Sequence, residues 1–88
     1  MIIKQTGHFY MRKKERRLIA AFYTTHDAMA FEDYCRAKNA DGRLIPLPRE
    51  ISAGCGLAWS APPDDGENLK ELLEGAGIRA QVIRIVEI

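Results

Sequence analysis

The residue best suited to act as a reactive group is Cys55, which lies between two glycines in the segment Pro48–Leu57. Gly54 and Gly56 permit positive φ angles and leave room for the backbone of a ligand or partner beside the thiol. Successive amide N–H groups in such a turn can converge on an anion, and a thiolate is an anion. The first hypothesis is therefore a nucleophilic thiol presented by this segment, which is longer than the usual hairpin connection.

Basic side chains flank this thiol in the sequence. Arg49 and Arg43 would favour a thiolate if they lie near Cys55, and Ser52 could donate a further hydrogen bond. Such surroundings lower the pKa of a cysteine and make it nucleophilic. The alternative for Cys55 is a small buried side chain that fills a turn, because free cysteine is among the most buried residue types. The alternative for each arginine is a solvated charge.

The second cysteine and the histidines add little chemistry. Cys35 falls on the apolar stripe of a predicted helix, so we expect it in the core. His26 begins that helix and is expected to be exposed, although a Cys–His pair would require it near Cys55. The spacing of the two cysteines with His8 and His26 fits no metal site. The sequence contains no phosphate loop, carboxylate pair or dinucleotide fingerprint, so we expect no cofactor.

Hydrophobic patterns and turn signals predict six elements that position these residues. Strands are expected at Leu18–Tyr23, Arg43–Leu47, Leu57–Ala61 and Ile78–Ile88, with helices beginning at Thr24–Thr25 and at Pro62–Asp65. Pro46 cannot donate a ladder hydrogen bond, so its strand should lie at a sheet edge. The order β-α-β-β-α-β with right-handed crossovers predicts an α+β, ferredoxin-like fold, in which a four-stranded antiparallel sheet carries both helices on one face.

Composition sets the organisation and the class of the protein. The 88 residues suffice for one small domain. Residues 1–17, with six basic side chains and one acid, are interpreted as a basic appendage that folding does not need; residues 18–88, with seven basic and eleven acidic side chains, form the domain. An acidic domain is a poor nucleic-acid surface, and no apolar run reaches the ~20 residues that span a membrane. We expect a cytoplasmic protein with free thiols.

The helices of such a fold cover one face of the sheet only. The other face should then be solvated or paired with a second copy, so a homodimer is a candidate assembly.

Three stretches of the chain resemble the Putative Se/S carrier protein-like family. They are Thr24–Ala30, Gly42–Pro46 and Pro48–Ala58. The similarity runs from about Leu18 to the carboxyl terminus, and its most specific part is the Pro-Arg-Glu-Ile block followed by Cys-Gly.

The resemblance implies a carrier rather than an enzyme, with sulfur or selenium held on Cys55 as a persulfide or selenopersulfide. It implies that Arg49, Ser52, Gly54 and Gly56 surround this sulfur. The implied partners are a donor enzyme, such as a cysteine desulfurase, and an acceptor protein.

Two other functions remain open from the sequence. A thiol redox protein would use Cys35 as the resolving thiol for Cys55, which requires their Cα atoms within roughly 7 Å. A small-molecule-binding regulatory domain would use the loop to bind an anion, and fold analogy alone supports it.

Overall fold

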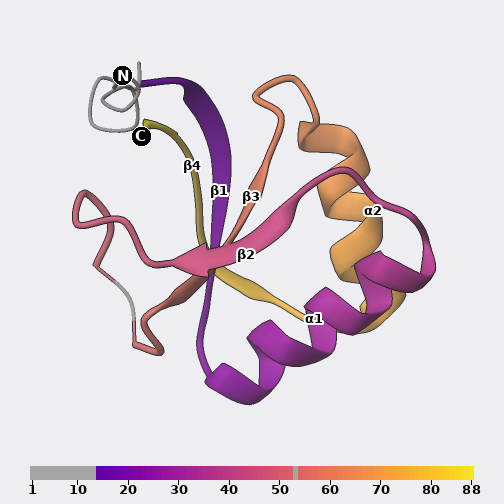
Figure 1. Cartoon of the computed structure of the whole chain (residues 1–88). Helices are drawn as coiled ribbons and strands as arrows, with labels where there is room; N and C mark the ends of the chain where they lie inside the picture. Colours follow the sequence, from indigo (N-terminus) through magenta and orange to yellow (C-terminus); the bar gives the residue numbers. More distant parts are fainter. Residues whose placement is uncertain (1–13, 53) are drawn as a thin grey trace, which may run out of the picture.

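The computed structural model describes residues 14–52 and 54–88 (Figure 1). Most of the predicted appendage therefore lies outside the described residues. The elements, in chain order, are β1 (Arg16–Phe22), α1 (Thr25–Ala37), β2 (Arg43–Pro46), β3 (Leu57–Ala61), α2 (Gly66–Ala76) and β4 (Ala80–Glu87). Their order is the predicted one.

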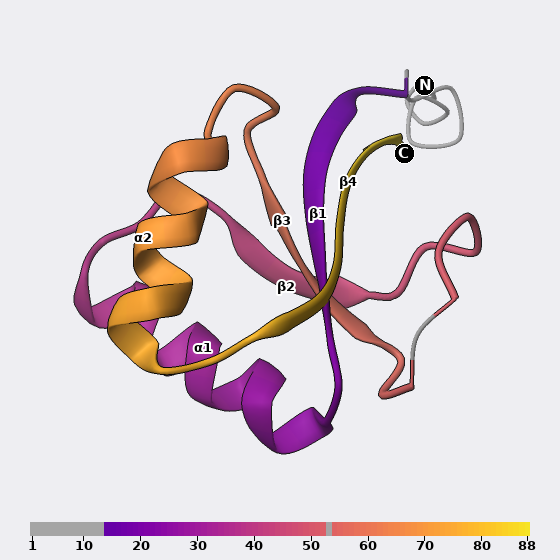
Figure 2. The same cartoon turned by 180° about the vertical axis from the view of Figure 1, so that it is seen from behind.

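The strands form one antiparallel sheet in the order β2-β3-β1-β4. Both helices lie against the same face of this sheet, as the two opposite views show (Figures 1 and 2). The α+β, ferredoxin-like prediction is confirmed. The strand that contains Pro46 lies at an edge, as expected of a residue that has no N–H to donate to a second neighbour.

The first helix begins where its sequence predicts. The Thr24 hydroxyl accepts a hydrogen bond from the Asp27 N–H at 3.0 Å, which satisfies a backbone donor that the helix itself leaves free. The Asp27 carboxylate in the first turn also interacts favourably with the positive end of the helix dipole.

The second helix begins later than its sequence predicts. The prolines and acids at 62–65 form a turn in which the Asp65 N–H donates to the Pro62 carbonyl at 3.1 Å, and the helix starts only at Gly66. The helix ends at Ala76 and is capped by Gly77, whose φ of 71° is a left-handed conformation that glycine adopts without strain.

The main core lies between the sheet and the helices. Phe31 of α1 packs against Phe22 of β1 and, edge to face, against Trp59 of β3, with ring centroids 5.5 and 5.4 Å apart. Cys35 is fully buried in the same core, as predicted, and this burial raises its pKa to about 11 because the charged thiolate is poorly solvated there.

The first strand begins before Leu18. Glu15 and Ile88 exchange two backbone hydrogen bonds, of 2.9 and 3.0 Å, and β1 starts at Arg16. Arg17 donates from Nε to the Ser60 hydroxyl at 2.9 Å. The last residues of the predicted appendage are thus part of the sheet, which corrects the boundary between appendage and domain.

A second, smaller core covers part of the other sheet face. Ile19 and Ala21 of β1 are fully buried there, and Ile51 from the loop between β2 and β3 packs on them with only 4% of its surface exposed. The expectation that this face is entirely solvated or paired is therefore wrong for the part under the loop. No described helix is long and apolar enough to cross a membrane.

Candidate functional site

Backbone hydrogen bonds and apolar contacts hold the described part of the loop between β2 and β3. The Leu47 N–H donates to the Gly56 carbonyl at 2.9 Å, which continues the β2–β3 ladder by one pair. A tight turn follows, in which the Ile51 N–H donates to the Pro48 carbonyl at 3.0 Å. The turn directs Ile51 down onto the sheet, so apolar burial fixes the middle of the loop.

Two side chains of β4 hold the loop from the opposite edge of the sheet. Arg84 donates from Nη1 to the Glu50 carbonyl at 3.1 Å, and Gln81 accepts at Oε1 from the Gly54 N–H at 3.3 Å. Because β2 and β4 are the two edge strands, the loop leaves one edge of the sheet, contacts the other edge and then returns to β3.

A β-bulge lets both anchors reach the same loop. On a regular strand, side chains alternate between the two faces of the sheet. Residues 81 and 84 are three positions apart, so without a bulge their side chains would lie on opposite faces. In the register of β1 with β4, Ala21 is opposite Val82 and Phe22 is opposite Ala80, so Gln81 has no partner residue. Bulges of this kind redirect a side chain. The sequence analysis missed both anchors, and the available signal was a pair of polar residues interrupting a strand rich in Ile and Val.

Cys55 sits where the loop turns into β3. It is partly exposed, and its side chain packs at the rim of the main core. The sulfur lies 3.4 Å from the Leu57 amide nitrogen, which donates to it, and 3.5 Å from the Leu57 carbonyl oxygen, which can accept the thiol proton. An amide that points at the sulfur stabilises negative charge that develops there.

The glycines on either side of Cys55 act differently. Gly56 has a φ of 79°, in the left-handed region, as predicted for a residue that turns the chain. A methyl group added at Gly54 would lie 3.5 Å from the Tyr23 carbonyl oxygen, an ordinary contact, so the loop rests against the segment that leads into α1. The Gly54 amide points to Gln81 rather than to the sulfur, so within residues 14–52 and 54–88 a single amide, that of Leu57, donates to Cys55 instead of the several amides expected.

Arg49 and Arg43, the two arginines predicted to favour a Cys55 thiolate, occupy different positions relative to the loop. Arg49 is exposed in the turn of the loop, and Ser52 is exposed beyond it. Arg43 pairs with Ser60, whereas Pro46 pairs with Leu57 next to the loop. Three strand residues separate Arg43 from that end, about 10 Å at ~3.3 Å per residue. The prediction that Arg43 supplies charge near Cys55 is therefore wrong. Among the described residues, neither Arg49 nor Ser52 forms a hydrogen bond with Cys55.

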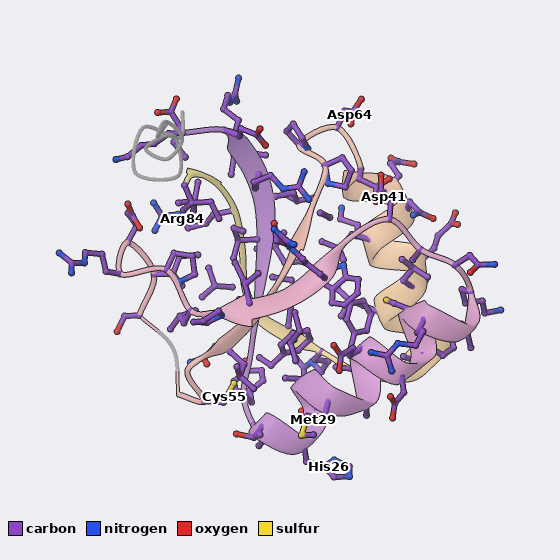
Figure 3. The ribbon with its side chains drawn as sticks, viewed as in Figure 1. His26, Met29, Asp41, Cys55, Asp64 and Arg84 are labelled. Atoms are coloured by element: carbon purple, nitrogen blue, oxygen red, sulfur yellow. The ribbon has the colours of Figure 1, made fainter. Side chains whose placement is uncertain are left out.

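Neither His26 nor Cys35 is placed to assist Cys55. The His26 side chain is 91% exposed and points away from Cys55 into solvent, although both lie at the same end of the sheet (Figure 3). Cys35 is ten residues along α1 from Thr25, about 15 Å at 1.5 Å per residue. The resolving-thiol hypothesis therefore lacks the required geometry. Within residues 14–52 and 54–88, no group of three or more potential ligand side chains could hold a metal ion.

A family model described as Putative Se/S carrier protein-like matches residues 17–84. The chain belongs to this family. The stretch that defines the Se/S carrier protein-like family here contains both cysteines, the whole loop and both β4 anchors. No curated protein and no solved structure matched the chain.

Proposed function

We propose that the protein carries sulfur or selenium, bound to the Cys55 sulfur as a persulfide or selenopersulfide, between a donor enzyme and an acceptor protein. The observation that carries this proposal is the contrast between the two thiols. Cys55 is partly exposed on a tethered loop with an amide directed at its sulfur, whereas Cys35 is buried in the core.

The chemistry needs only an accessible thiol. In the loading step, the Cys55 thiolate attacks the terminal sulfur of a donor persulfide; a new S–S bond forms, the donor's S–S bond breaks, and the donor thiolate leaves. In the unloading step, an acceptor nucleophile attacks the terminal sulfur of the Cys55 persulfide, and the Cys55 thiolate leaves. The Leu57 amide would stabilise the negative charge that Cys55 regains. Selenium transfer follows the same two displacements.

The other residues around Cys55 are consistent with a carrier protein rather than an enzyme. The described residues place no base within hydrogen-bonding distance of the Cys55 sulfur, so proton transfers would fall to the partners. Tyr23 precedes α1 beside the loop, Met29 lies in the second turn of that helix, and both are more than half exposed. Exposed apolar side chains of this kind suit transient docking of a donor such as a cysteine desulfurase, in the reducing cytoplasm.

Intact mass under non-reducing conditions tests the proposal. The protein is incubated with a cysteine desulfurase and cysteine, and in parallel with a selenocysteine-supplied donor. We expect one added sulfur or selenium atom, removed by dithiothreitol. Cys35→Ser should load normally and Cys55→Ser should not. Equal loading of the two variants, or no loading of the unaltered chain, would refute the proposal.

A further inference from the structure

The two edge strands of the sheet differ in length and composition. The strand β2 has only four residues and ends in Pro46, whereas β4 runs over eight residues, Ala80–Glu87, without a proline. An edge strand presents unpaired backbone N–H and C=O groups, and proteins usually protect such edges with short strands, prolines or bulges. The bulge of β4 lies near its beginning, at Gln81, so the remainder of the strand is a regular open edge.

The hydrogen bonds between β1 and β4 show which backbone groups face this edge. Glu15 and Ile88 exchange both of their backbone bonds, at 2.9 and 3.0 Å, so the groups of Ile88 point toward β1. Along an antiparallel pair, such residues alternate with residues whose N–H and C=O groups point the other way. The register is regular from Glu87 back to Val82. Ile83, Ile85 and Glu87 therefore direct their backbone groups away from β1, to the open edge.

Two of these three residues also expose large apolar side chains. Ile83 is 41% exposed and Ile85 is 36% exposed. They lie opposite Ala20 and Leu18 of β1, on the sheet face that carries the helices. Within the described residues, β4 has no strand neighbour on its outer side. A partner strand with apolar side chains would bury both isoleucines and pair the backbone groups beside them.

A second copy of β4 meets both requirements. In antiparallel pairing about a two-fold axis at Ile85, this residue lies opposite Ile85 of the second copy, and Ile83 lies opposite Glu87 of the second copy. Because all three residues direct their backbone groups to the edge, each of these pairs can exchange both hydrogen bonds. Such an interface is self-complementary, as a two-fold dimer requires.

Charge and the bulge select this register. It places Arg84 opposite Val86 of the second copy. Sliding one strand by two residues places Arg84 opposite Arg84 of the second copy, where like charges repel, and brings the bulged Gln81 into the pairing. Sliding it the other way separates Ile83 from the isoleucines of the second copy. The register about Ile85 avoids all three faults.

We propose that the protein forms a homodimer in which β4 pairs with β4 of a second copy about a two-fold axis at Ile85. The pairing joins the two sheets into one, and the isoleucines of both copies form one apolar cluster on the helix-bearing face. Ile83, Ile85 and Glu87 are not part of the Cys55 loop, so this proposal does not depend on sulfur or selenium transfer.

Sedimentation velocity of the full chain, with a reductant present to exclude disulfides, tests the assembly. We expect a monomer–dimer equilibrium that shifts with protein concentration. Hydrogen exchange of β4 peptides, measured by mass spectrometry, should show additional protection of the Ile83, Ile85 and Glu87 amides only where the dimer predominates. A monomer up to submillimolar concentration would overturn the proposal. A dimer without this protection would mean that another surface pairs, and protection already present in the monomer would mean that another segment of the chain covers the edge; either result would also overturn it.

Two variants with the same incoming side chain locate the interface. Ile85→Lys places two ammonium groups beside each other at the axis and removes an apolar contact from each copy, so the dissociation constant should rise more than about tenfold. Met29→Lys changes an apolar side chain of α1 that is 55% exposed, and it should dimerise as the unaltered chain does. Equal dissociation constants for the two variants would overturn the interface. The exchange experiment uses the unaltered chain, so it decides the question even if Ile85→Lys does not fold.

Discussion

Alkylation of the folded protein by iodoacetamide at neutral pH should modify Cys55 far faster than Cys35. Only the thiolate reacts, so the rate depends on the thiolate fraction and on access. Burial raises the pKa of Cys35 from an ordinary value of 9.0 to about 11. Two pKa units reduce its thiolate fraction about a hundredfold at neutral pH.

The different solvent accessibility of the two thiols further increases the difference between their alkylation rates. Cys35 has no exposed surface, so reagent reaches it only when the core opens, whereas Cys55 is partly exposed in the folded chain. We therefore expect a rate ratio above about a hundred. In denaturant the two rates should converge, because unfolding removes the burial that distinguishes the thiols.

The assay is time-resolved peptide mass spectrometry after quenching, with Cys35→Ser and Cys55→Ser as single-thiol references. Comparable rates for both cysteines in the native protein would refute the reasoning. That outcome would mean that Cys35 is not buried as described or that Cys55 is not accessible, and it would remove the contrast on which the proposed carrier role depends.

Three further predictions test the fold and the loop. Because the folded-state pKa of Cys35 is raised, its thiol contributes stability that is fully present below pH 9 and is lost as pH rises toward 11, by up to about 3 kcal/mol; urea titrations should show this loss in the unaltered chain and not in Cys35→Ala. Gln81→Ala should accelerate hydrogen exchange of the Gly54 amide, measured by NMR, whereas Gln81→Glu keeps an acceptor oxygen and should not; equal exchange in both variants would exclude the anchor. A chain beginning at Leu18 should melt well below one beginning at Lys14, because it loses four residues that include the paired Glu15 and the start of β1; equal melting temperatures would show that these residues add nothing.

Cys35 and Pro46 illustrate which structural features local sequence patterns can predict. Cys35 recurs at helical spacing with Ala28 and Phe31, so its place in the core follows from periodicity, and the structure buries all three. The edge position of β2 was likewise predictable, because Pro46 has no backbone N–H to donate to a second neighbouring strand. In both cases the determining interaction is local or intrinsic to one residue, so the pattern alone contains it.

Local sequence patterns could not predict which residues surround Cys55 and hold its loop. Proximity in sequence suggested Arg43 as its neighbour, yet an extended strand carries residues apart by about 3.3 Å each, so Arg43 ends far from the loop. The actual anchors, Gln81 and Arg84, follow Cys55 by more than 25 residues and reach the loop only because of a bulge.

The sequence by itself determined the element order, the fold class, the edge strand and the buried thiol, because short-range periodicity, capping and proline chemistry control them. Tertiary structure alone decided that the loop folds over the second sheet face, that β4 tethers it, and that Ile83 and Ile85 lie exposed on an edge strand. These features depend on strand register and on contacts between distant segments. A register shift of one residue reverses which face a side chain occupies, and local patterns do not specify it.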